Sequence, residues 1–209
     1  MTDAAAADAS AGSDRYFDDL YGASEDPYGL CDRWYERRKR ALILAALPQP
    51  RYRCAFEPGC GIGAFTLALA GRCDELEASD RSARAVELAR QRTAQLPHVH
   101  VTRQDLPADW PQGSGRFDLI VVAELGYFLD DAAMQALARC CADSLTDDGT
   151  LVACDWRPDF AERKLATDAV HAHLEALAMP RLLRHVEDDF ALQVWCRDGR
   201  SVAQREAIR

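Results

Sequence analysis

The chain has 209 residues, 48% hydrophobic and 28% charged, which is typical of one globular domain with a sizeable core. Its formal net charge of −9 argues against binding to a nucleic-acid backbone, because such binding depends on clustered cations. No segment approaches the ~20 apolar residues of a membrane span, and the N-terminus lacks the pattern of a secretory signal. We therefore expect neither nucleic-acid nor membrane partners.

The eight cysteines include no C-x-x-C pair, and several lie within apolar runs. Cysteine in such runs packs as a small hydrophobic residue. We expect reduced thiols in a cytoplasmic protein and no metal site.

The N-terminal quarter of the chain changes character twice. Residues 1–12 are mostly Ala, Asp and Ser with no aromatic side chain and are predicted to be a disordered leader. Residues 13–50 are predicted to form a helical lid, with a short amphipathic helix from Tyr16 and a longer one over residues 34–47. Pro48 and Pro50 would end the longer helix.

Strands and helices alternate over residues 51–197, the predicted main domain. The run Phe117–Ala123 is almost entirely apolar, as expected for a parallel strand covered on both faces. The last two strands, near 182–186 and 190–196, flank an acidic turn, which predicts a hairpin with one antiparallel strand. Residues 198–209 are the expected C-terminal tail. The other expected strands end near Glu57, Asp80, Asp105 and Cys154, and the strand that ends at Cys154 begins at Thr150. The expected helices cover residues 65–70, 82–96, 130–145 and 161–177. The predicted fold is α/β and doubly wound, with a mostly parallel, seven-stranded, Rossmann-like sheet.

The stretch Glu57–Gly63, which reads EPGCGIG, is the strongest functional signal. It follows a short apolar run and opens into a helical pattern. Glycines at such a turn let a ligand lie directly against the backbone, and the acid at the strand end suits cationic or hydroxylated groups. This arrangement predicts a nucleoside-type cofactor at the mouth of the sheet. A glycine turn without a ligand is the alternative.

The glycines alone do not identify the cofactor. Gly59, Gly61 and Ala64 also fit the dinucleotide pattern, and Asp80 lies at the offset of about 20 residues that both cofactor classes require for the ribose. Three features favour S-adenosylmethionine over NAD: the preceding lid, the C-terminal hairpin in place of a second mononucleotide half, and Asp105 before Leu106. Asp105 could accept the adenine amino group while Leu106 packs against the ring.

These motifs resemble class I S-adenosylmethionine-dependent methyltransferases, and within them the NodS-like (nodulation protein S) family. The similarity covers about Tyr16 to Arg197. The matching text is DPY at 26–28, WYERRK at 34–39 and FDLIVVAE at 117–124. The resemblance implies an N-methyltransferase, whose family acceptor is the free amine of a deacetylated chitooligosaccharide. One departure is Asp155, which precedes Trp-Arg where the family pattern often has His.

The expected site residues follow from the strand ends and the resemblance. Catalytic candidates are Glu124 after the fourth strand, Asp155 after the fifth, and His171 on the next helix, because an amine must be neutral to attack and a base helps. Each has a structural alternative: a loop hydrogen bond, a cap or a packing role. Arg38 would either pair with the methionine carboxylate or be a surface charge. The expected cofactor contacts are Trp34, Arg38, Glu57, Gly59, Cys60, Gly61, Gly63, Asp80, Arg81, Asp105, Leu106, Ala123 and Glu124.

We therefore predict an S-adenosylmethionine-dependent methyltransferase, a monomer or homodimer, that acts on a small molecule. The acceptor would be the nitrogen or oxygen of a sugar-like compound or an amine. The alternatives are an NAD(P)-binding oxidoreductase and a non-catalytic domain that keeps the cofactor fold.

Overall fold

A seven-stranded sheet organises the chain, with strand order β3-β2-β1-β4-β5-β7-β6. The computed structural model describes residues 16–113 and 115–209, so the expected leader, residues 1–12, lies outside the described residues. The strands are β1 Tyr52–Pro58, β2 Cys73–Asp80, β3 Val99–Arg103, β4 Phe117–Ala123, β5 Leu145–Trp156, β6 Arg181–Val186 and β7 Phe190–Cys196.

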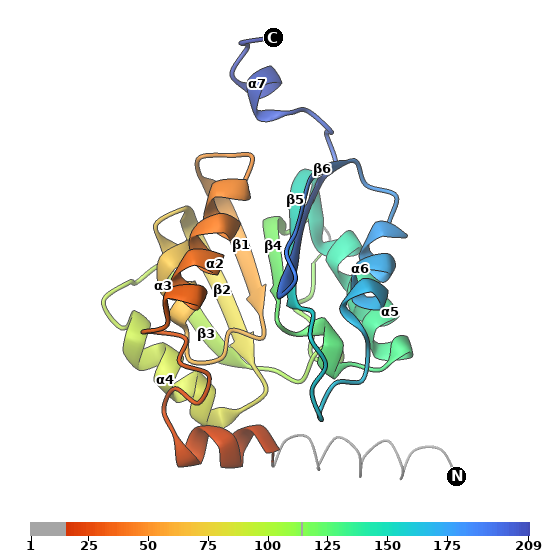
Figure 1. Cartoon of the computed structure of the whole chain (residues 1–209). Coiled ribbons are helices and arrows are strands. Elements are labelled where there is room, and N and C mark those ends of the chain that lie inside the picture. The colour runs from red at the N-terminus through yellow and green to blue at the C-terminus, as the bar shows by residue number, and fades with distance from the viewer. Residues whose placement is uncertain (1–15, 114) are drawn as a thin grey trace.

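The strand directions confirm the predicted mixed sheet. β1 to β5 are parallel, whereas β7 runs antiparallel to both β5 and β6. The carboxyl ends of the parallel strands therefore share one edge, the lower one in Figure 1. The turn of the β6–β7 hairpin reaches the same edge, because β6 runs parallel to β5 and ends there.

Helices cover both faces of the sheet (Figure 1). They are α2 Trp34–Ala46, α3 Ala64–Ala70, α4 Ala83–Thr93, the 3-10 turn η1 Gly126–Phe128, α5 Asp131–Ser144, α6 Thr167–Glu175 and α7 Val202–Arg205. α2 and α3 pack on one face and α5 and α6 on the other, each pair within its own buried cluster. α4 packs beside α3 over β2 and β3.

Alternation along the strands explains the two cores. In β5, Val152 and Cys154 face the α2 side, while Leu151 and Ala153 face the α6 side. All four are fully buried, as expected when successive side chains of a central strand point to opposite covered faces. By the same alternation Asp155 faces α6. This register places a carboxylate under that helix.

Several predicted boundaries were wrong. β5 begins at Leu145, directly after α5, because Leu145 already pairs with Phe117. α6 begins at Thr167 rather than residue 161, because Arg163 donates hydrogen bonds to carbonyls at the end of β5 and holds residues 157–166 as a loop. α4 ends at Thr93, before the predicted residue 96.

The N-terminal segment packs across the carboxyl edge of the sheet. Residues 16–23 are helical. The Phe17 ring meets that of Phe128 edge-on at 5.0 Å, and the Ser82 hydroxyl donates to Asp18 at 2.5 Å. This placement agrees with a lid, but the division of the chain into lid, main domain and tail stays a prediction. Within the ranges that the structure describes, no helix is long and apolar enough to cross a membrane.

Candidate active site

The glycine-rich turn between β1 and α3 adopts the backbone that only glycine takes readily. Gly61 has φ of +53° and Gly63 has φ of +75°. A Cβ on Gly63 would lie 3.0 Å from the Cα of Ala89 in α4, and one on Gly61 would lie 3.1 Å from the hydroxyl of Tyr21. Gly63 therefore permits close packing of two helices, and Gly61 permits close approach of the N-terminal segment.

Asp80 ties this turn to the end of β2. Its carboxylate accepts the backbone N–H of Gly61 at 2.8 Å and that of Ser82 at 2.9 Å. Burial raises the pKa of Asp80, and the two N–H donors act in the opposite direction. The acid predicted from its spacing thus lies beside the glycine turn, where it can meet the ribose of a nucleoside.

Glu57 is a buried acid with an open oxygen. It is the penultimate residue of β1 and is 4% exposed, and its Oε2 has no hydrogen-bond partner among the described residues. Burial raises the pKa of Glu57 to about 8; the Thr66 hydroxyl acts in the opposite direction, and the charge of Asp80 adds to the rise. A buried carboxyl without a partner is costly, unless a ligand supplies the missing donor. The glycine turn, Asp80 and Glu57 together fit the ribose and ammonium groups of S-adenosylmethionine.

Glu124, directly after β4, is the most connected side chain of the site. One oxygen accepts from Lys39 Nζ at 2.5 Å, and the other accepts from the Tyr127 hydroxyl at 2.5 Å and the Trp156 N–H at 3.0 Å. Its backbone lies in the left-handed region, with φ of +56°. Glu124 thus connects the end of β4 to α2, η1 and β5. Both of its carboxylate oxygens accept donors from the protein itself.

Sequence reasoning missed Lys39. It is 6% exposed and is the only lysine or arginine among the described residues that is buried. Burial by itself lowers the pKa of Lys39, but Glu124 and Glu36 outweigh that effect and raise it. The available signal was the four-residue spacing of Lys39 and Ile43, the two buried positions of α2.

Trp34 and Arg38, two of the expected cofactor contacts, lie outside the buried side of α2. Trp34 is 70% exposed. Arg38 forms a two-pronged ion pair with Glu187 of the β6–β7 hairpin, at 2.8 and 2.6 Å. It therefore fastens the helix to the hairpin, and Lys39 takes the inward position next to it.

Asp155 and His171 form a buried pair. His171 Nε2 lies 3.0 Å from Asp155 Oδ2; Asp155 is fully buried and His171 is 4% exposed. Burial raises the pKa of Asp155, and the hydrogen bond from His171 opposes that shift. Within the described part of the chain, Asp155 Oδ1 and His171 Nδ1 have no hydrogen-bond partner.

The other predicted cofactor contacts lie along the same edge of the sheet. Arg81 Nη2 lies 3.4 Å from Asp105 Oδ1, and the Asp105 side chain is 51% exposed. Leu106 packs against the core on the α5 side, Cys60 is buried in the glycine turn, and Ala123 precedes Glu124. No group of three or more His, Cys, Asp or Glu side chains in residues 16–113 and 115–209 is arranged to hold a metal.

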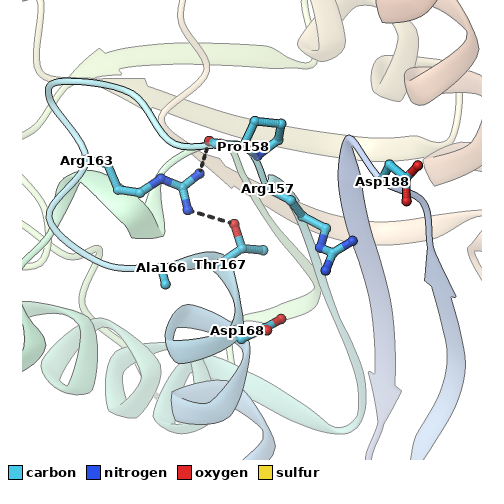
Figure 2. A pocket seen from close by; sticks show the side chains of 7 residues that line it. All are labelled: Arg157, Pro158, Arg163, Ala166, Thr167, Asp168 and Asp188. Carbon is cyan, nitrogen blue, oxygen red and sulfur yellow. Dashed lines mark hydrogen bonds between the residues drawn. The ribbon is translucent and has the colours of Figure 1, made fainter.

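A polar pocket of about 230 Å³ opens beyond the end of β5 (Figure 2). Arg163 is fixed in it by hydrogen bonds to the Thr167 hydroxyl at 3.2 Å and the Pro158 carbonyl at 3.0 Å, and its guanidinium lies over the rings of Tyr127 and Phe160. The pocket is lined by Arg157, Pro158, Arg163, Ala166, Thr167, Asp168 and Asp188.

The sequence is similar to known nodulation proteins. The chain matches the family Nodulation protein S (NodS) over residues 17–186. It is 35% identical to Nodulation protein S of Rhizobium tropici over 117 residues, 56% of this chain and 48% of that one. It is 33% identical to Nodulation protein S of Bradyrhizobium diazoefficiens over 143 residues, 68% of each chain. The chain thus spans about half the length of the first of these relatives and two thirds of the second.

Solved structures share the fold. A Pseudomonas syringae protein provisionally described as a methyltransferase is 53% identical, with a TM-score of 0.71 over 79% of this chain and 100% of that one. The N-methyltransferase NodS from Bradyrhizobium japonicum WM9, in complex with S-adenosyl-l-homocysteine, is 27% identical, with a TM-score of 0.78 over 88% of this chain and 97% of that one. The chain therefore belongs to the Nodulation protein S (NodS) family.

Proposed function

We propose that this protein transfers a methyl group from S-adenosylmethionine to the nitrogen or oxygen of a small polar acceptor. The observation that carries the proposal is the contact between Asp80 and the Gly61 N–H at 2.8 Å, beside the open, buried oxygen of Glu57. This contact brings Asp80 and Glu57 together with a stretch of glycine backbone that carries no side chains. An adenosyl amino acid needs both the acids and such a backbone for binding. The SAH-bound NodS relative supports the same choice of ligand.

The described residues account for binding and orientation. Asp80 would accept hydrogen bonds from the ribose hydroxyls, and Glu57 would accept one from the ammonium group. When bound, S-adenosylmethionine would supply an electrophilic methyl carbon, which the acceptor's lone pair would attack in line while the bond to sulfur breaks and S-adenosylhomocysteine leaves. Tyr21, 5% exposed and close to Gly61, would cover this part of the site and exclude water.

We assign the proton-accepting role to His171. The Asp155 carboxylate accepts Nε2–H and so fixes the imidazole tautomer with Nδ1 as the acceptor nitrogen. Glu124 fits this role less well, because both of its oxygens already accept protein donors. Of the three catalytic candidates, Glu124 therefore serves as an anchor, while Asp155 and His171 act as the orienting acid and the base.

The polar pocket is the proposed place for the acceptor. Thr167 and Asp168 line it from the first turn of α6, and His171 lies one turn further along the same helix. Two arginines and two aspartates in the lining favour an acceptor rich in hydrogen-bonding groups, such as an amine or a sugar-like molecule. The relatives named as nodulation proteins, one of them an N-methyltransferase, make nitrogen the first choice of methylated atom.

Isothermal titration tests the cofactor. We expect S-adenosylhomocysteine to bind at micromolar levels and to raise the melting temperature, and NADH to do neither. The competing oxidoreductase interpretation predicts the reverse. A panel of amines, amino sugars and hydroxylated metabolites, assayed with labelled S-adenosylmethionine, then identifies the acceptor. Tight cofactor binding with no acceptor at all would favour a non-catalytic domain.

We also propose a reducing, cytoplasmic location. All eight cysteines are free thiols, and burial raises the pKa of Cys60 and Cys141 well above the ordinary range of a thiol. Such thiols are poorly reactive packing residues. Alkylation of the folded protein should modify the partly exposed Cys31 before the buried ones, without loss of cofactor binding.

A further inference from the structure

Lys39 reaches from α2 to the loop that follows β4. Its Nζ lies 2.5 Å from Glu124 Oε1 and 3.3 Å from Glu36, and it lies over the Tyr35 ring at 5.0 Å. The Lys39 side chain is 7% exposed. An ammonium group this deep is stable only with close carboxylate partners, so the helix and the loop depend on each other through this ion pair.

The loop that Lys39 holds has an unusual backbone. Glu124 is one of few non-glycine residues among the described ones with positive φ, a strained conformation that persists where surrounding contacts enforce it. The residue after it, Leu125, places its Cδ1 3.2 Å from where a Cβ of Gly59 would stand. The conformation of Glu124 therefore decides how Leu125 packs on the first glycine of the cofactor turn.

The second oxygen of Glu124 extends the arrangement to β5. It accepts the backbone N–H of Trp156, and the Trp156 ring meets the Tyr35 ring edge-on at 5.7 Å. Because Tyr35 lies one turn before Lys39 on α2, the contacts form a closed circuit. It runs from α2 through Glu124 to β5 and back to α2.

We propose that Lys39 is a positioning residue: through its ion pair with Glu124 it fixes the strained loop after β4 and so shapes the glycine turn for the cofactor. This inference rests on the proposed function. In this inference Lys39 contacts neither the cofactor nor the acceptor. Its role differs from that of Arg38 on the same helix, which pairs with Glu187 of the hairpin.

The test is a set of three variants measured for S-adenosylhomocysteine affinity by titration calorimetry. Lys39→Met leaves the half-buried Glu124 carboxylate without its cation, so the loop should relax and the dissociation constant should rise about tenfold or more. Glu124→Gln keeps an oxygen for Trp156 and Tyr127. In the double variant Lys39→Met/Glu124→Gln the loop after β4 carries no uncompensated charge, and affinity should recover most of the way to that of Glu124→Gln alone. Lys39→Arg should also restore part of the affinity.

The outcomes separate this inference from the proposed function. If the wild-type protein does not bind S-adenosylhomocysteine, the proposed function fails and the inference fails with it. If the wild-type protein binds and Lys39→Met binds equally well, only the inference is overturned. If Glu124→Gln does not recover the loss in the double variant, Lys39 acts directly on a ligand and the positioning role is wrong. Arg37→Met, an exposed neighbour on α2, is the matched control and should bind as the wild type does. Circular dichroism at the titration temperature establishes that each variant is folded.

Discussion

His171 Nε2 and Asp155 Oδ2 lie 3.0 Å apart in the buried space between α6 and the end of β5. Asp155 ends the run of buried side chains in β5, and His171 approaches it from the neighbouring helix α6. The imidazole thus lies at the strand end although it is carried by another element. This relationship supports the catalytic assignment more strongly than either residue does alone.

His171→Ala should reduce kcat by about 10²–10⁴-fold, the usual contribution of a positioned general base, with little change in affinity for S-adenosylhomocysteine. Steady-state kinetics and calorimetry together check this expectation. His173→Ala is the matched control, since His173 lies on the same helix and pairs with Asp131 at the surface. A His171→Ala enzyme with wild-type kcat would leave the pair a structural role only.

Glu57→Gln should change how stability depends on pH. The pKa of Glu57 in the folded protein is raised to about 8 from an ordinary value of 4.5, so its contribution to stability is complete below pH 4.5 and is lost as the pH rises through 8. The free energy of unfolding of the wild type, relative to the uncharged Gln variant, should therefore fall across that window. Urea unfolding at several pH values measures it, and parallel curves for the two proteins would contradict the raised pKa.

Cofactor binding should release a proton from Glu57. If the ammonium group of the ligand meets the open Oε2, the carboxyl ionises on binding, since a nearby cation favours the charged form. Near neutral pH, the calorimetric enthalpy of S-adenosylhomocysteine binding should then vary with the ionisation enthalpy of the buffer. That variation should disappear in Glu57→Gln. If the binding enthalpy of Glu57→Gln still varied with the buffer, the released proton would come from another group.

Asp80→Ala should weaken S-adenosylhomocysteine binding by ~1–3 kcal/mol, as expected for the loss of a charge-assisted hydrogen bond. Part of the loss comes from the Gly61 N–H, which would lose its acceptor. Asp74→Ala is the control on the same strand, because Asp74 is half-exposed and pairs with Arg51 at the opposite end of β2. Unchanged affinity in Asp80→Ala would remove this acid from the site.

Gly63→Ala should lower the melting temperature. The substitution strains a backbone with φ of +75° and brings a methyl group within 3.0 Å of the Ala89 backbone, at a cost of roughly 1–3 kcal/mol. Gly71→Ala, at the other end of α3, has an ordinary φ of −65° and open space around it. It should leave the melting temperature unchanged or raise it slightly. Equal effects at the two glycines would contradict the close approach of α3 and α4.

Local patterns in the sequence were enough for the order of the strands along the chain and for the position of the cofactor turn. β4 was predicted with its correct bounds because a seven-residue apolar run has one stable environment, the centre of a covered sheet. Asp80 was assigned to the same site as the glycine turn from its spacing, since a strand–turn–helix unit fixes where the next strand must end. Residues 161–166 of the loop were predicted as helix because its stabilising contacts, from Arg163 to the Trp156 and Pro158 carbonyls, leave no periodic signal.

The sequence by itself thus determined the α/β class, the family and the acids that lie at the carboxyl edge of the sheet. Only the tertiary structure decided that Lys39, rather than Arg38, turns inward, and that His171 is the partner of Asp155. Both outcomes depend on how a helix is rotated about its axis as it packs on the sheet. That rotation is set by long-range burial of side chains such as Ile43 and Val170, and adjacent residues in the chain carry almost no information about it.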